Sequence, residues 1–163
     1  MFSVRYGATR FPGKPLVNIL GKSMTQRVWK AIKDSKGLDQ TIIATDDERI
    51  YKSCKAFGAD VRTTSEKHQS GTDRIVELAE KLDLELIVNM QGDEPLANQD
   101  IIEAIINSLM RDKSEFRMGS LARKLQDEEL QNPNVVKVWI DSSGRAVYFS
   151  RQPHKNGDGE LFA

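Results

Sequence analysis

The segment RYGATRFPGKPL, residues 5–16, places three cations among glycines and prolines close to the start of the chain. Arg5, Arg10 and Lys14 lie within ten residues of one another, and the glycines allow the backbone to turn its N–H groups inward. Backbone donors combined with long cationic side chains suit a triphosphate, although the segment matches neither GxxxxGK[ST] nor GxGxxG. The alternative is a surface loop whose Arg and Lys side chains are simply solvated.

A second candidate is QGDEP, residues 91–95, which directly follows the apolar run LIVNM, residues 86–90. Carboxylates at the end of a buried strand are typical ligands for Mg²⁺ that bridges substrate phosphates, so Asp93 and Glu94 are candidates. The alternative is a helix-entry turn whose acids lie near the positive end of the helix dipole. That alternative fits Glu94 better than Asp93.

A third loop, EKHQSGTDR, occupies residues 66–74. Its Ser-Gly-Thr-Asp run is typical of a turn and helix N-cap, and this structural interpretation is favoured on physical grounds. In the functional alternative, Gln69 and Ser70 supply hydrogen-bonding groups that read a base, and Arg74 clamps an anion. His68 stands alone and is interpreted as a surface residue rather than a metal ligand.

The fourth loop, ATDD at residues 44–47, lies at the end of the run TIIAT, residues 41–45, which is predicted to be the second strand. We interpret Thr45 or Asp46 as the cap of the next helix. Cys54 falls on the apolar face of that helix, which indicates an inert core thiol rather than a nucleophile.

The elements that must position these loops are predicted from short β-branched runs, which alternate with segments whose apolar residues recur at helical spacing. The runs predict strands at 41–45, 86–90 and 135–140, and the periodic segments predict helices at 23–37, 46–58, 72–82 and 98–112. This alternation predicts an α/β protein with a mainly parallel sheet, in which ligands bind beyond the carboxyl ends of the strands.

The two ends of the chain depart from this alternation. Residues 136–151 read as two strands around DSSG, which predicts a hairpin and a mixed end to the sheet. The opening strand is short, and the polar tail at 154–163 is expected to be loose and not to return to the sheet. We therefore expect that a segment is missing at both ends.

Composition predicts one domain over residues 1–163, with 39% hydrophobic and 29% charged residues and no apolar run long enough for a membrane span. A single cysteine and the absence of a signal-peptide pattern predict a cytoplasmic location. The net charge is zero, yet residues 1–37 carry eight Lys or Arg and one acid. This asymmetry predicts one cationic site for an anionic ligand, or a solvated lysine-rich helix face.

Six segments, RYGATRFPGKPL, ATDDERI, HQSGTDR, VNMQGDEP, NPNVVKV and RAVYFSR, occur in the order and spacing of the sugar-acid cytidylyltransferases. Over residues 4–151 the chain resembles the 3-deoxy-manno-octulosonate (Kdo) cytidylyltransferases, the CMP-Kdo synthetases of lipopolysaccharide assembly. The resemblance implies a Rossmann-like nucleotidyltransferase fold, a three-layer α/β/α sandwich of the nucleotide-diphospho-sugar transferase type. It also implies a homodimer, with no nucleic acid and no membrane as partner.

The implied reaction joins CTP and Kdo to give CMP-Kdo and pyrophosphate, with Mg²⁺ as cofactor. Carried over position by position, the resemblance implies catalytic roles for Arg10, Lys14 and Asp93, with Asp93 as the metal ligand. Gln91 and Arg151 fall in segments that approach the sugar acid. The nucleotide-binding residues implied are Arg5, Tyr6, Gly7, Arg10, Lys14, Gln69, Ser70 and Arg74.

Two departures from the family pattern limit the expected activity. Phe2, Ser3 and Val4 stand where the family has a longer apolar strand, and the later part of the family pattern is absent. We therefore expect nucleotide binding with weak or no turnover from this chain alone. The alternatives are a CMP-sialic acid or other sugar nucleotidylyltransferase, a non-catalytic nucleotide- or RNA-binding fragment, and a structural fragment kept for assembly.

Overall fold

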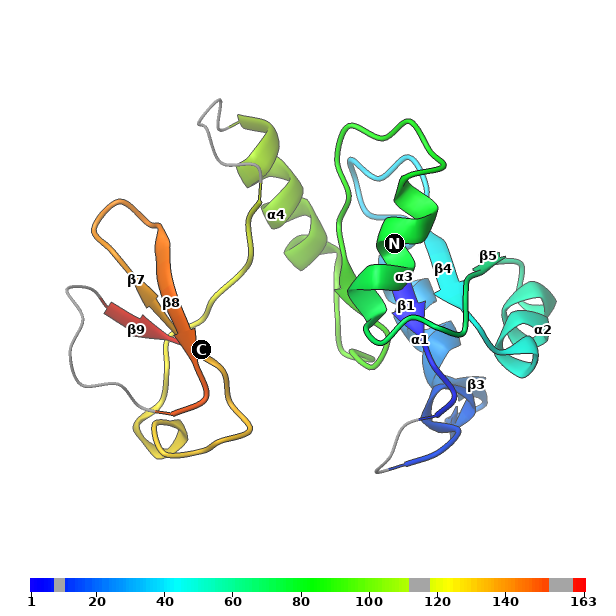
Figure 1. The fold of residues 1–163 in the computed structure, drawn as a ribbon, viewed down its shortest axis with the longest axis horizontal. Coiled ribbons are helices and arrows are strands. Elements are labelled where there is room, and N and C mark those ends of the chain that lie inside the picture. The colour runs from blue at the N-terminus through cyan, green and yellow to red at the C-terminus, as the bar shows by residue number, and fades with distance from the viewer. Residues whose placement is uncertain (8–10, 112–117, 153–159) are drawn as a thin grey trace. The chain divides into compact units, whose positions relative to one another are not determined.

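The opening strand β1 (Phe2–Val4) lies inside a parallel sheet, with a neighbour on each side. The computed structural model divides into two compact units, residues 1–115 and 116–163 (Figure 1). It describes residues 1–7, 11–111, 118–152 and 160–163. That the whole chain forms a single nucleotidyltransferase domain stays a prediction.

The sheet of the first unit has the order β5-β4-β1-β6, and its strands are parallel. Phe2 of β1 is in register with Ile43 on one side and Met90 on the other. The remaining strands are β4 (Ile42–Thr45), β5 (Asp60–Thr63) and β6 (Met90–Gln91). Because the strands run the same way, the loops after β1, β4 and β6 leave the same edge of the sheet.

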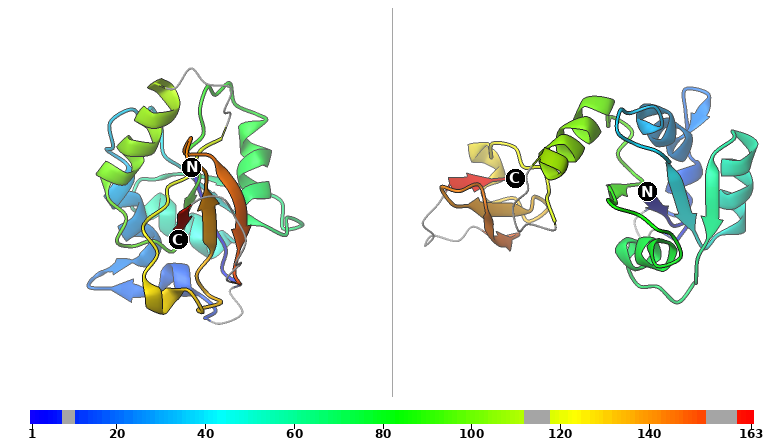
Figure 2. Two further views of the ribbon diagram at one scale, coloured as in Figure 1. Left: turned by 90° about the vertical axis from the view of Figure 1, so that its left-hand side faces the viewer. Right: turned by 90° about the horizontal axis from the view of Figure 1, so that it is seen from above.

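Helices cover both faces of this sheet, as Figure 2 shows for α1 and α3 in its right-hand view. Phe2, Val4 and Ile43 form one core cluster with apolar residues of α1, α2 and α4. Ile42 and Ala44 pack instead with Leu78 of α3. The helices are α1 (Met24–Ile32), α2 (Glu48–Ala56), α3 (Gly71–Ala79) and α4 (Gln99–Arg111). The predicted three-layer α/β/α arrangement is confirmed for this unit.

The predicted helix boundaries rest on caps that the structure allows us to check. Ser23 Oγ accepts a hydrogen bond from the Gln26 N–H at 3.1 Å, which confirms Ser23 as the N-cap of α1. The prediction that Thr45 or Asp46 caps α2 is wrong, because the N-cap is Asp47. Thr45 instead accepts a hydrogen bond from the Asp47 N–H at 3.2 Å, and so supports the cap from the preceding strand.

The segment LIVNM is a strand only at its end, so the predicted strand at 86–90 is largely wrong. Within it only Met90 is assigned to a strand, β6, while Leu86, Val88 and Met90 still pack against the core. The strand β5 was missed because its sequence DVRT alternates buried and polar residues too briefly to give a clear signal.

A short antiparallel pair precedes α1. The 3₁₀ turn η1 (Lys14–Leu16) leads into β2 (Asn18–Ile19) and β3 (Lys22–Ser23). Leu20 and Gly21 have positive φ angles of 49° and 81° at the turn between these strands. This local pair lies between the loop after β1 and the first helix.

The second unit contains a separate three-stranded antiparallel sheet of order β8-β7-β9. The DSSG hairpin is confirmed between β7 (Lys137–Ile140) and β8 (Ala146–Ser150). The third apolar run, however, does not join the parallel sheet, and the tail does return to a sheet, as β9 (Glu160–Phe162). The 3₁₀ turn η2 (Asp127–Glu129) precedes this sheet. Among the residues described in either unit, no helix is long and apolar enough to cross a membrane.

Candidate functional site

Two glycines allow the loops at the carboxyl edge of the sheet to approach β1. A Cβ on Gly92 would lie 2.6 Å from the backbone oxygen of Ser3, and a Cβ on Gly71 would overlap the Ser3 hydroxyl. A Cβ cannot come this close to a backbone atom, so position 92 needs glycine, whereas a side chain at position 71 would require the Ser3 hydroxyl to move. Through these contacts the loop after β6 and the start of α3 are both placed against the central strand.

The loop that follows β1 is closed by contacts between Tyr6 and Gly13. The Gly13 N–H donates to the Tyr6 carbonyl oxygen at 3.0 Å, and Gly13 has a φ of 74°. A Cβ there would lie only 3.1 Å from the Tyr6 hydroxyl oxygen. Lys14 then begins η1, and buried Pro15 anchors that turn. Of the predicted catalytic residues, Arg10 lies outside the described residues.

This arrangement brings together Lys14 and Asp93, two predicted catalytic residues that are 79 positions apart in the chain. Lys14 Nζ donates to Asp93 Oδ2 at 2.7 Å, and the two side chains are 34% and 52% exposed. Such an ion pair is only weakly stabilising in water, so both groups can exchange partners with an incoming ligand. An ammonium and a carboxylate side by side can hold a phosphate chain and its divalent cation, respectively.

A backbone carbonyl group of the loop before α3 contacts Arg5, the first residue of segment 5–16. Arg5 Nη1 donates to the carbonyl oxygen of Gln69 at 2.9 Å. Ser70 forms a capping box with Asp73, each side chain accepting the other's N–H at 3.1 Å. Hydrogen bonding to the Asp73 carboxylate from the Ser70 side chain, and then from the Ser70 N–H, lowers the pKa of Asp73. The structural interpretation of Ser70 as an N-cap is thus confirmed, and its nucleotide-binding role stays a prediction.

Arg74 is held inside the first unit. Its side chain has no exposed surface, and it pairs with Asp46 while donating to Thr64 Oγ1 at 3.0 Å and to the Ser65 carbonyl oxygen at 3.1 Å. A direct contact with an anion would require this buried pair to open. The anion clamp predicted for Arg74 therefore stays a prediction that the observed contacts do not favour.

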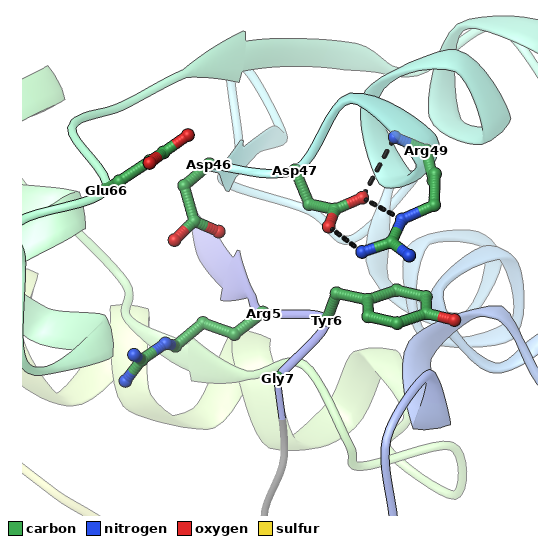
Figure 3. A pocket seen from close by; sticks show the side chains of 7 residues that line it. All are labelled: Arg5, Tyr6, Gly7, Asp46, Asp47, Arg49 and Glu66. Atoms are coloured by element: carbon green, nitrogen blue, oxygen red, sulfur yellow. Dashed lines mark hydrogen bonds and ion pairs between the residues drawn. The ribbon is translucent and has the colours of Figure 1, made fainter.

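A cavity of about 290 Å³ opens beside the carboxyl ends of β1 and β4. Figure 3 shows Asp46 between Arg5 and Glu66 on one side, and the Arg49 guanidinium over the Tyr6 ring on the other. The residues that line it are Arg5, Tyr6, Gly7, Asp46, Asp47, Arg49 and Glu66. Arg5, Tyr6 and Gly7 were predicted as binding residues and are thus brought together.

Sequence reasoning missed Asp46, Asp47, Arg49 and Glu66 as lining residues. Asp47 accepts two bonds from Arg49, at 3.0 Å from Nε and 2.6 Å from Nη2. These bonds lower the pKa of Asp47 and raise that of Arg49. The available signal was the position of ATDD at a strand end, which had been interpreted only as a helix cap.

The two predicted sugar-acid residues lie in different units. Gln91 is exposed at the end of β6, where it is in register with Ser3. Arg151 donates to the carbonyl oxygens of Pro133 and Asn134 at 3.1 and 3.2 Å. Among the described residues, no group of three or more His, Cys, Asp or Glu could hold a metal ion.

The fold and these loops define an α/β protein whose first unit contains a parallel sheet, with a candidate ligand site at the carboxyl ends of its strands. Residues 3–157 match the family described as cytidylyltransferase. The chain belongs to the cytidylyltransferase family.

Its relatives include the 3-deoxy-manno-octulosonate cytidylyltransferase of Geobacter metallireducens, 45% identical over 93% of this chain and 60% of that protein. The protein of the same name from Pseudomonas syringae pv. tomato is 46% identical over 91% of this chain and 59% of its own length. The chain thus spans about 60% of the length of these curated relatives.

Two solved structures share the fold of this chain. A CMP:2-keto-3-deoxy-manno-octonic acid synthetase complexed with CTP superposes with a TM-score of 0.91 at 34% identity, covering 99% of this chain and 68% of that one. A cytidylyltransferase from Leptospira borgpetersenii shares the fold with a TM-score of 0.64 at 21% identity, covering 80% of this chain and 55% of its own.

Proposed function

We propose that this chain binds CTP at the carboxyl edge of the parallel sheet and serves the transfer of its cytidylyl group to 3-deoxy-manno-octulosonate. The observation that carries the proposal is the 2.7 Å contact between Lys14 Nζ and Asp93 Oδ2, formed by loops that follow two adjacent strands. The family, the names of the relatives and the solved relative complexed with CTP support the choice of nucleotide and sugar acid.

In the proposed reaction, a hydroxyl oxygen of the sugar acid attacks the α-phosphorus of CTP. The bond between the α-phosphorus and the bridging oxygen breaks, pyrophosphate leaves, and the hydroxyl proton passes to solvent. The chain's part is to position the triphosphate and stabilise its charge, for which Lys14 and Arg10 are the cations proposed.

Asp93 would hold Mg²⁺. Its partly exposed carboxylate fits this ion, which needs few protein ligands because it keeps several waters and takes oxygens from phosphates. Bound there, Mg²⁺ would neutralise charge on the triphosphate. A homodimer and a cytoplasmic location remain predictions.

Calorimetric titration of the chain with CTP, in the presence of Mg²⁺, tests the binding proposal. Lys14→Met should weaken CTP binding by roughly ten- to a hundredfold, the effect of losing a charged hydrogen bond to a phosphate. Lys22→Met is the matched control, because Lys22 is an exposed lysine of the same basic segment. It should leave the affinity unchanged.

Pyrophosphate release distinguishes the proposed substrate from the alternatives. We expect release by this chain to be weak, and what release there is with CTP present should depend on Kdo and not on sialic acid. A chain that binds an oligonucleotide in a salt-dependent manner but does not bind CTP would overturn the proposal in favour of a nucleic-acid-binding module.

A further inference from the structure

Arg49, the second residue of α2, is fixed in orientation by its neighbour Asp47. Its Nε and Nη2 atoms donate to the two carboxylate oxygens at 3.0 and 2.6 Å, while the Arg49 backbone N–H donates to the same carboxylate at 2.9 Å. Two parallel bonds from a planar guanidinium fix the plane of the group as well as its position. The positive charge of Arg49 is therefore already paired with the Asp47 carboxylate, although the Arg49 side chain is 60% exposed.

The fixed guanidinium lies over Tyr6. Arg49 Cζ is 3.3 Å from the centre of the Tyr6 ring, well within the range of a cation–π contact (Figure 3). Because the edge of the guanidinium is occupied by Asp47, its face is the part left to contact the ring. Arg49 thus connects the start of α2 to a residue 43 positions earlier in the chain.

Tyr6 in turn closes the loop that leads to Lys14. Its carbonyl oxygen accepts the Gly13 N–H at 3.0 Å, and its hydroxyl end is packed against Gly13 so tightly that a Cβ there would lie at 3.1 Å. Both ends of the segment between Tyr6 and Gly13 are therefore held at one place. Lys14 follows directly and reaches Asp93 from there.

We propose that Arg49 is a positioning residue for the nucleotide: through its contact with the Tyr6 ring it maintains the contact between Tyr6 and Gly13, so that Lys14 is placed for the triphosphate. This inference rests on the proposed function. Arg49 acts through the aromatic ring and does not itself need to contact CTP. Loss of the contact between Arg49 and Tyr6 should leave Lys14 in its binding position for a smaller fraction of the time and reduce the affinity for CTP by that fraction.

The test compares Arg49→Met with Arg62→Met in the full 163-residue chain. Arg62 is a matched control because it also binds the Asp two residues before it, with Nε and Nη2 at 3.4 and 3.0 Å from the two oxygens of Asp60. Arg49→Met should raise the Kd for CTP about five- to tenfold, the scale of a partly exposed cation–π contact, and Arg62→Met should change it less than about twofold. Arg49→Lys keeps the charge but not the planar fork, and should fall between Arg49→Met and the unsubstituted chain.

Two further measurements separate this role from a merely structural one. Hydrogen exchange at the Gly13 amide should become faster in Arg49→Met and stay unchanged in Arg62→Met, since only the first variant loosens Tyr6. In a Tyr6→Leu background, Arg49→Met should produce no additional loss of CTP affinity, because the contact through which it acts is gone.

The outcomes also distinguish this inference from the proposed function. If the unsubstituted chain does not bind CTP, the proposed function fails. The hydrogen-exchange rates at Gly13 then still decide whether Arg49 maintains the contact between Tyr6 and Gly13. If CTP binds but Arg49→Met leaves both its affinity and Gly13 exchange unchanged, the inference is overturned. Additive losses in the Tyr6→Leu background would also overturn it.

Discussion

Replacing Asp46 with Ala should lower the free energy of unfolding of the first unit by about 3 kcal/mol, because it leaves the Arg74 charge buried without its counter-ion. The Arg74 side chain is 0% exposed and that of Asp46 is 18% exposed. Arg74→Met should cost about 2 kcal/mol, since the remaining carboxylate is nearer to solvent while Thr64 and Ser65 lose a donor. The double variant removes both charges and should cost about 3 kcal/mol, well below the sum of the two single costs.

Urea unfolding followed by tryptophan fluorescence measures these costs in the first unit. The chain has two tryptophans, Trp29 in α1 and Trp139 in β7, so a Trp139→Phe background leaves Trp29 as the reporter for the unit that contains the pair. Lys52→Met is the control, because Lys52 forms an exposed ion pair with Glu48 and should cost less than about 0.5 kcal/mol. Additive costs in the double variant, or single costs below about 1 kcal/mol, would refute the reasoning.

Three further predictions concern the metal, acid stability and thiol reactivity. Asp93→Asn should abolish the gain in CTP affinity that Mg²⁺ produces, without weakening binding in EDTA, as measured by calorimetry; an unchanged gain would contradict Asp93 as the ligand. Bonds led by the Ser65 N–H hold the pKa of Glu77 at about 2, against 4.5 unperturbed. This stabilisation is therefore present above pH 4.5 and lost as the pH falls toward 2, so Glu77→Gln should flatten the acid unfolding curve over that window; an equally steep curve would contradict the cause. Burial raises the pKa of Cys54 to about 12, so a thiol reagent should label it only as fast as the unit unfolds, and faster labelling would contradict its burial.

The helices and two of the three N-caps were predicted because their signals are local, although α1 ends at Ile32, five residues before its predicted end. Ser23 and Ser70 each lie three residues before the N–H that they accept, so a short window of sequence contains both partners. The α2 cap was placed one or two residues early because Thr45, Asp46 and Asp47 are all good caps in sequence. The choice among them depends on the direction in which β4 ends.

Strands were predicted less well because their partners are distant. The run at 86–90 has enough apolar residues for a strand, yet β1 pairs only with its end, at Met90 and Gln91. The run at 135–140 is also mostly apolar, yet it forms an antiparallel sheet with residues that follow it in the chain. Apolar content predicts burial in both cases, but it does not determine which strand becomes the neighbour.

Within the site, the loops were found from sequence but their contacts were not. Lys14 and Asp93 meet because parallel strands place the loops that follow them at one edge of the sheet. The predicted parallel topology was enough to anticipate this contact. The contact between Arg49 and Tyr6 could not be anticipated, because nothing in ATDDERI indicates which side chain the arginine faces. Its partner is set by the pairing of β1 with β4.

Burial separates cation–carboxylate pairs that look alike in sequence. Arg74 with Asp46 and Lys14 with Asp93 are both a base and an acid from neighbouring loops, and both bases were predicted to bind nucleotide. Opening the first pair would leave an uncompensated charge in the interior at a cost of about 3 kcal/mol or more, whereas opening the second costs about 1 kcal/mol or less because water reaches both groups. Binding of a ligand to Lys14 therefore requires little free energy to break the ion pair with Asp93. Binding to Arg74 would require breaking its pair with Asp46, which would offset much of the binding free energy. The two pairs of a base and an acid thus differ in what they can do: under the proposed function the exposed pair would exchange with a ligand, whereas the buried pair holds together the segments that contain Asp46, Thr64 and Arg74.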